Sequence, residues 1–457
     1  MFNKKSKLIL ISIIIFVSTI FIIFLGQKNL PQYDCSNCNV IIISIHSLRA
    51  DHVGIDGYER NTTPNIDRFF RNGYVFRNAF AQAPLTLPSD MTMLTGLYPS
   101  HHGLISVEVA ETLSPKYKTL AEILKAYDYT TVGFHGGADG TSPQFGFDRG
   151  FDEYVIYDFV GNDSKLIGFL NSSENQKFFL FLDTSGRGVH DPYLSIPPYE
   201  TMFDNNYHGK IISDLDEFQK LMKENNISYD DFDSRRTFYW SFVNKSDSRD
   251  IQHLIALYDA NIFRYDEFFG KFFDYLNSSG LLNRTIIIFT TDHGEEFGEH
   301  GGFMHSRLYD ETIRVPLLVF LPNSKNGMIH EQVGLVDIVP TVLSFLNITQ
   351  PAEIDGRNLN FLIENPNNVD TNATLFSEFL FTRAVRTPEW KLIKNFERNI
   401  TYEFYNIKND SSEKVNLVGK GIPEEAELKN LMKNYEIRMN STYFNPQLIN
   451  STFIGYP

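Results

Sequence analysis

The sequence predicts an α/β fold, because apolar strands alternate along it with an amphipathic helix. Three apolar, β-branched runs, at residues 39–45, 177–183 and 284–292, predict strands buried on both faces of a mostly parallel sheet. Between the last two runs, apolar residues recur every three or four positions from Leu254 to Leu276, which predicts a long helix ending at an NSSG turn. Ligands of such open sheets bind beyond the carboxyl ends of the strands.

Two regions depart from this alternation. Residues 195–250 are polar and carry no apolar run, so we expect an insertion, either a lid or a solvated loop. After about residue 345 the pattern changes to short strands with turn signals, as in TYEFYNIKNDSSEKVNL, which predicts a smaller antiparallel subdomain.

The N-terminus carries a membrane signal. Lys4, Lys5 and Lys7 precede an unbroken apolar run from Leu8 to Leu25, which is long enough to come close to spanning a bilayer. A cleaved signal peptide is the alternative, but its apolar part is usually about 7 to 15 residues and a small-residue cleavage site follows it. We therefore expect a transmembrane signal anchor.

This anchor sets the expected organisation of the chain. Residues 1–7 form a cytoplasmic stub, residues 8–26 the anchor, and residues 27–38 a linker. A catalytic domain at residues 39–345 and a C-terminal subdomain at residues 346–457 follow. The three lysines place both outside the cell, on a single-pass protein of the cell membrane.

Composition limits the partners and the environment. A net charge of −15 argues against nucleic acid as a partner. The two cysteines, Cys35 and Cys38, are too few for a zinc site and indicate a disulfide or a pair of free thiols. An excess of N-x-S/T sequons suits a glycosylated surface, although a chain rich in Asn, Ser and Thr also produces them. The thirteen sequons begin at Asn61, Asn162, Asn171, Asn226, Asn244, Asn277, Asn283, Asn347, Asn372, Asn399, Asn409, Asn440 and Asn450.

Polar side chains follow two of the predicted strands. SIHSLRADH places His46 and Ser47 after the first strand, and TTDHGEEFGEHGGFMH places Asp292 and His293 after the third. A carboxylate beside an imidazole at a strand end is good metal-ligand chemistry. A DHG triplet after a strand is more often a simple turn, so the inference depends on the joint order of the segments.

A third segment, TLPSD, predicts a helix start. Pro88 followed by Ser89 or Asp90 is typical of a first helical turn, because Ser and Asp accept hydrogen bonds from free helix N–H groups. The hydroxyl of Thr86 would then face the positive end of a helix, a ready site for an anionic ester. A threonine before Leu-Pro is most often structural, and the segment alone decides nothing.

Taken together, these segments resemble the sulfatase family of the alkaline phosphatase superfamily. The resemblance begins with VIIISIHSLRADHVGIDGYERNTTPNIDRFFRNGYVFRNAFAQAPLTLPSDMTMLTGLYPSHHG and continues in order with FGFDRGFDEY, HDPY, TTDHGEEFGEHGGFMHSRLYDETIRVPLLVF, GLVDIVPTVLSFLNI and FYNIKNDSSEKVNL. It covers about residues 39–420. It implies an α/β/α sandwich with a C-terminal antiparallel subdomain.

The resemblance also implies roles for several residues. Asp292 and His293 match the family's second pair of metal ligands. His305 falls where sulfatases keep a basic residue that contacts the ester, and His190 falls at a histidine near the leaving group. Thr86 falls at the position of the nucleophile.

Three positions depart from the family pattern. Sulfatases carry a Cys or Ser that is oxidised to formylglycine at the position of Thr86, and Thr cannot give that aldehyde. Asp90 replaces the arginine of the same motif. The family's first metal-binding carboxylates would fall at His46 and Ser47, neither of which is an acid.

These departures leave alternative functions open. A threonine is a usable nucleophile beside a divalent ion, and superfamily relatives that act on phosphate esters use one. A site of His46, Thr86, Asp292 and His293 suits one zinc or manganese ion better than calcium, which prefers six to eight oxygen ligands. We expect a hydrolase or transferase acting on sulfate or phosphate esters, carried by a glycan or a lipid head group. A catalytically inactive protein that binds an anionic surface glycan or another envelope component is the alternative, and a formylglycine-type sulfatase is a third.

Overall fold

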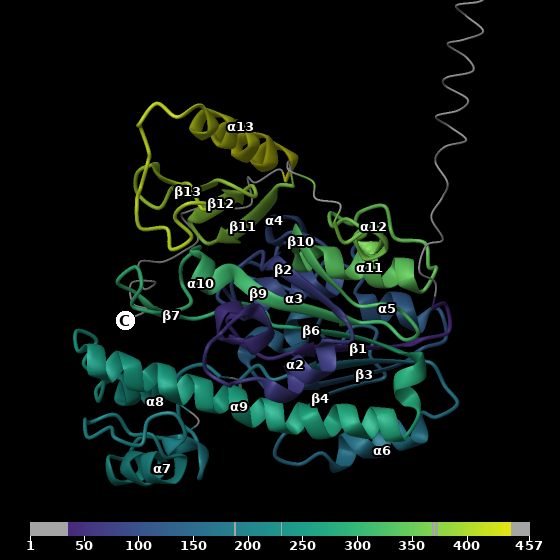
Figure 1. The fold of residues 1–457 in the computed structure, drawn as a ribbon, viewed down its shortest axis with the longest axis horizontal. Helices are drawn as coiled ribbons and strands as arrows, with labels where there is room; N and C mark the ends of the chain where they lie inside the picture. Colours follow the sequence, from purple (N-terminus) through teal and green to yellow (C-terminus); the bar gives the residue numbers. More distant parts are fainter. Residues whose placement is uncertain (1–34, 187–188, 230, 368–369, 371–372, 440–457) are drawn as a thin grey trace, which may run out of the picture.

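The computed structural model describes residues 35–186, 189–229, 231–367, 370 and 373–439 (Figure 1). The anchor expected at residues 8–26 lies outside this range. Among the described residues, no helix has both the length and the apolar character that crossing a membrane requires.

A sheet of eight strands forms the centre of the fold. β9 runs antiparallel to both of its neighbours, whereas the other neighbouring pairs are parallel, which confirms the mostly parallel sheet. The three strands predicted from apolar runs are β1, β5 and β6, which are adjacent and buried along their whole length. In spatial order the strands are β10 (Gly327–Gly334), β2 (Tyr74–Phe80), β9 (Arg314–Phe320), β6 (Thr285–Thr290), β1 (Asn39–Ser44), β5 (Phe178–Asp183), β3 (Thr130–His135) and β4 (Glu153–Ile156).

Helices cover both faces of this sheet and give the expected α/β/α sandwich (Figure 1). One face packs against α3 (Thr86–Thr95), α5 (Leu120–Lys125), α11 (Ile338–Phe345) and α12 (Asn360–Glu364). The other packs against α2 (Pro64–Phe70), α6 (Ser164–Ser172) and α9 (Ser248–Ser278). α9 contains the helix predicted between Leu254 and Leu276, and both of these residues are buried against the sheet. Short elements complete the layers: α4 (Pro99–His102), α10 (Asp310–Ile313) and 3-10 turns at residues 50–52, 54–56, 139–141, 143–145, 199–201, 281–284 and 335–337.

The polar insertion is folded. It contains α7 (Leu215–Glu224) and α8 (Phe232–Trp240), which lie beside α9 in Figure 1. Phe218, Met222, Tyr239 and Trp240 join the core on the α9 side of the sheet. The expectation of a solvated loop is therefore wrong. The few buried side chains are spread among many polar ones, so the sequence shows no apolar run.

The C-terminal part forms the predicted antiparallel subdomain. A sheet of four strands pairs in sequence order: β11 (Leu375–Phe379), β12 (Thr382–Arg386), β13 (Lys391–Asn395) and β14 (Thr401–Tyr405). α13 (Pro423–Arg438) covers one face of this sheet. Leu308 and Ile313 of the main domain pack against the other face. Just before Leu308, a hairpin of β7 (Glu296–Phe297) and β8 (Phe303–Met304) extends from the main domain.

The two cysteines form a disulfide. Cys35 and Cys38 are bonded to each other at the start of the described chain. The backbone N–H of Cys35 donates to the carbonyl of Phe345, at the end of α11. Of the two alternatives for this pair, the structure shows the disulfide.

Candidate active site

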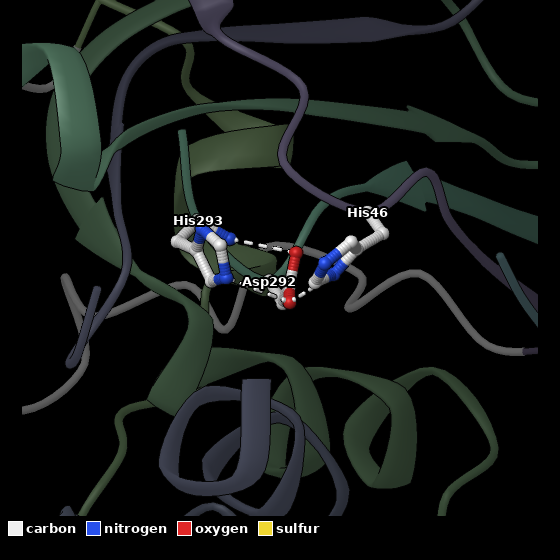
Figure 2. Close-up of side chains that lie close together, drawn as sticks. All are labelled: His46, Asp292 and His293. Carbon is white, nitrogen blue, oxygen red and sulfur yellow. Dashed lines mark hydrogen bonds and ion pairs between the residues drawn. The ribbon is translucent and has the colours of Figure 1, made fainter. Parts of the chain in front are cut away.

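The carboxyl ends of β1 and β6 bring three ligand-type side chains together. His46 Nδ1 lies 2.7 Å from Asp292 Oδ2, and His293 Nε2 lies 3.2 Å from the same oxygen. One ligand atom from each of the three residues lies within 4.8 Å of the others, so they could hold a metal ion. Figure 2 shows the two imidazoles on either side of the carboxylate.

Backbone contacts fix how these ligands point. Asp292 Oδ1 accepts hydrogen bonds from the backbone N–H groups of Ser47 and His293, both at 3.0 Å. His293 Nδ1 lies 2.9 Å from the carbonyl oxygen of Gly294, which can only accept, so this nitrogen carries the proton. In the neutral ring, His293 Nε2 then carries the lone pair, and it is buried without a hydrogen bond. A cation is the partner that this lone pair lacks.

Burial and mutual contact set the protonation of the three residues. Burial opposes the charge of Asp292, but His293 and His46 outweigh it and hold the pKa of the carboxyl well below its usual range. Burial lowers the pKa of His46, so its ring is neutral near neutral pH. For His293 burial acts in the same direction, but Asp292 outweighs it and raises the pKa. An ionised acid next to imidazoles is a donor set that fits a divalent ion.

Thr86 is the first residue of α3, which places its side chain at the helix N-terminus. The prediction that Ser89 or Asp90 starts this helix is wrong: α3 begins at Thr86, and no side chain caps it. Pro88 is tolerated in this first turn because its missing N–H would have no helical partner. The Ser89 hydroxyl instead donates to the carbonyl of Asp292 at 2.7 Å, which ties α3 to the end of β6.

One large cavity contains the predicted catalytic residues. It has a volume of about 1110 Å³, and His46, Thr86, His190 and His305 line it. The ring of His46 lies 4.6 Å from that of His190, and the ring of His293 lies 4.3 Å from that of His305, between centroids. The structure therefore places all six predicted site residues in and around one cavity.

His305 depends on a neighbour that sequence reasoning missed. Its Nδ1 lies 3.1 Å from Glu295 Oε2, and the Tyr193 hydroxyl donates to Glu295 Oε1 at 2.7 Å. Burial, followed by the charges of His293 and His190, holds the pKa of His305 well below its usual range. Burial raises the pKa of Glu295 to about 7. Glu295 belongs to the TTDHGEE motif, so its place in that motif could have identified it as a site residue.

His190 has a similar support. Its Nδ1 lies 3.3 Å from Asp191 Oδ1, and Arg236 of α8 pairs with Asp191 Oδ2 at 2.9 Å. The indole N–H of Trp240 donates to the same oxygen at 3.1 Å. The insertion thus holds the loop that carries His190, a role that the sequence did not reveal.

The family is settled by comparison with known proteins. Residues 38–348 match the profile described as Sulfatase, and residues 298–441 match that of the N-sulphoglucosamine sulphohydrolase C-terminal region. The chain belongs to the sulfatase family. Among relatives of this sulfatase-family protein, the N-acetylglucosamine-6-O-sulfatase of Bacteroides thetaiotaomicron is 24% identical, over 78% of each chain. Arylsulfatase K of Mus musculus is 25% identical, over 83% of this chain and 76% of its own.

Solved structures show the same fold. A structure described as bound to its substrate D-glucosamine-2-N,6-O-disulfate superposes with a TM-score of 0.74 at 19% identity, covering 91% of this chain and 100% of its own. The phosphonate monoester hydrolase of Agrobacterium radiobacter superposes with a TM-score of 0.70 at 18% identity, covering 90% and 97%. At these identities the likeness establishes the fold of this sulfatase-family protein and not its substrate.

Proposed function

We propose that this sulfatase-family protein is a metal-dependent hydrolase or transferase of sulfate or phosphate esters, with Thr86 as its nucleophile. One observation supports the proposal most directly: Thr86 lines the same cavity as His46, His190 and His305. Within the described chain, the Thr86 hydroxyl makes no hydrogen bond to another side chain or to the backbone. A hydroxyl at a helix N-terminus, beside a donor set that fits a cation, suits attack on an anionic ester.

The proposed metal ligands are His46, Thr86, Asp292 and His293. Two imidazoles, one carboxylate and one hydroxyl favour zinc or manganese over calcium, which prefers a larger number of oxygens. When bound there, a divalent ion would lower the pKa of the Thr86 hydroxyl and offset the negative charge of the ester.

The other residues have roles in the transfer. The Thr86 hydroxyl loses its proton to water in the cavity, and a bond forms from Oγ1 to sulfur or phosphorus while the bond to the leaving oxygen breaks. His190 supplies a proton to that oxygen, and His305 contacts the ester oxygens. Water then cleaves the ester formed on Thr86 in a hydrolase, or an acceptor hydroxyl takes the group in a transferase. Asp191 and Glu295 orient the two imidazoles, because each lies within contact of a ring nitrogen.

The proposed substrates are sulfate or phosphate esters of a glycan or a lipid head group. The named sulfatases among the relatives, and the neighbour bound to a disulfated glucosamine, favour a sulfated sugar. The cavity extends to Tyr229 and Phe232 of the insertion, which could contact the remainder of a substrate larger than the ester itself.

We also propose that the protein acts outside the cell, held by its N-terminal anchor. Each sequon asparagine among the described residues is exposed, which supports glycosylation of this surface. The Cys35–Cys38 disulfide suits an oxidising compartment. Protease added to intact cells tests this placement, because an extracellular domain is cleaved and a cytoplasmic one is protected.

A second candidate function is that of an inactive member of the family that binds an anionic glycan. The specific observation in its favour is the replacement of the family's acids by His46 and Ser47, together with Asp90 at the arginine position. Metal content and turnover separate the two. An enzyme binds zinc or manganese and cleaves a sulfate ester, a phosphomonoester or a phosphodiester, whereas an inactive descendant cleaves none of them.

A further inference from the structure

A second group of buried oxygens lies between α3 and the sheet. Ser44 of β1 and Asp183 of β5 are register partners at the carboxyl ends of their strands. Side chains alternate along a strand, so Ser44 faces the same way as Ile42, and Asp183 the same way as Phe181. Ile42 and Phe181 belong to the same core cluster as the buried residues of α3. Ser44 and Asp183 therefore point to the side of the sheet that α3 covers.

Asp90 comes to the same layer from α3. It lies one position before Met91 and three after Leu87, and both of these pack onto the sheet. It is completely buried, and its charge acts on those of Asp183 and Asp292. Two parts of the chain that are far apart in sequence thus place carboxylates close together in the interior.

These oxygens lack partners. Both carboxylate oxygens of Asp90, Asp183 Oδ2 and Ser44 Oγ are buried without a hydrogen bond. Asp183 Oδ1 accepts hydrogen bonds from the backbone N–H and the hydroxyl of Ser185, so only Oδ2 of this carboxylate has no hydrogen bond. The Ser185 hydroxyl is also close enough to stabilise the Asp90 charge, but it is directed to Asp183.

The charge of this group is uncompensated. Burial and then the neighbouring acids raise the pKa of Asp90 well above its usual range, and burial raises that of Asp183 to about 7. No lysine or arginine of the described chain contributes to the pKa shift of either carboxyl. Buried carboxylates are stable only with a cation, with hydrogen-bond donors or in the protonated form.

We propose that Asp90, Asp183 and Ser44 form a second cation site, behind Thr86 and separate from the group of His46, Asp292 and His293. All of its donors are oxygens, so the site suits a hard divalent ion such as magnesium, calcium or manganese. A cation there places positive charge inside the molecule, next to the helix that carries Thr86. The proposal does not depend on the proposed function, because binding is measured without turnover.

The test is the number of ions bound by the full-length protein after equilibrium dialysis against magnesium, calcium, manganese or zinc. We expect two ions per chain when zinc or manganese is present together with a hard cation. Asp90→Asn and Asp183→Asn should each weaken binding of one ion by about tenfold or more, because the amide keeps the shape and removes the charge. Asp139→Asn, an exposed acid of the same cavity, is the matched control and should keep both ions.

The same variants show whether a bound cation or a bound proton neutralises the two acids. An amide imitates a protonated acid, so an Asn variant with the ion content and melting temperature of the wild type means that the two acids are neutral. His293→Ala should lose the ion of the first site and keep the second. Should Asp90→Asn fail to fold, Asp183→Asn and the wild-type count decide. A wild type and an Asp183→Asn variant that bind the same number of ions with the same affinity overturn the proposal.

Discussion

His46 Nδ1 lies 2.7 Å from Asp292 Oδ2, although 246 residues separate them in the chain. The contact joins the carboxyl ends of β1 and β6, which are adjacent strands of the central sheet. Asp292 thereby stays ionised inside the protein, and the pKa of His46, lowered by burial, keeps its ring neutral. This pair supplies two of the proposed metal ligands.

Thr86→Ala should remove turnover and leave the fold intact. Thr86 is half-buried, and within the described residues its hydroxyl makes no hydrogen bond, so the free energy of unfolding should change by less than about 0.5 kcal/mol. The loss of a nucleophile should lower kcat by about a thousandfold or more. Thr86→Ser, which keeps a hydroxyl, is the control and should retain measurable activity. An alanine variant that turns over at the wild-type rate would show that another group attacks.

Asp292→Asn should abolish tight binding of zinc or manganese at the first site. The amide cannot supply the charge that pairs with His46 and His293, and losing a carboxylate ligand should cost about a hundredfold or more in affinity. Calorimetric titration of the chelated protein measures this. Asp139→Asn again serves as the control, and equal affinities in the two variants would remove Asp292 from the ligand set.

His46→Asp should change which metal is preferred. A carboxylate at this position adds oxygen ligands and charge, so affinity for calcium should rise relative to zinc by about tenfold or more. His46→Asn adds an oxygen ligand without the negative charge, so its comparison with His46→Asp isolates the effect of charge. Competition dialysis against both metals gives the ratio. A ratio that is the same in all three proteins would mean that His46 does not bind the ion.

Stability should fall on acidification because of His102. This residue is buried in α4, where Nδ1 accepts the N–H of Leu104 and Nε2 lies 3.3 Å from the carbonyl of Pro88 in α3. Burial lowers the pKa of His102 from 6.5 to about 3, so below pH 6.5 the unfolded chain takes up the proton first. The stabilisation from neutral His102 is complete above pH 6.5 and falls by about 1.4 kcal/mol per pH unit toward pH 3.

Urea unfolding at pH 6.5 and pH 5 measures this effect. His102→Gln has no proton to gain there, so its deficit relative to the wild type should shrink by about 2 kcal/mol at the lower pH. His330→Gln, at an exposed position, should follow the wild type at both pH values. A constant deficit in His102→Gln would contradict the assigned burial effect.

The apolar pattern was enough to predict the sheet and the longest helix. Buried strands and an amphipathic helix have periodicities that are local in the sequence, so β1, β5, β6 and α9 appeared where expected. The start of α3 was misplaced because the Ser89 hydroxyl serves the carbonyl of Asp292, a partner about 200 residues away. Local cap chemistry carries no information about such a contact.

Parts of the site were invisible for the same reason. Arg236 lies in a polar insertion, and nothing near it in sequence indicates that it pairs with Asp191. Asp90 looked like a helix-start residue, and the layer that it shares with Asp183 and Ser44 exists only once α3 packs on the sheet. His190 and His305 were identified through the family resemblance, because no periodicity in the sequence indicates that they belong to the site.

Peptide mass spectrometry of the metal-loaded protein, quenched during turnover of a sulfate or phosphate ester, tests the central claim most directly. We expect a sulfuryl or phosphoryl group on the peptide that contains Thr86, in the wild type and not in Thr86→Ala. The adduct should disappear when the ion is removed with a chelator. A wild type that carries no adduct, binds no metal and cleaves none of the esters would contradict the account and leave Thr86 as a remnant in a binding protein.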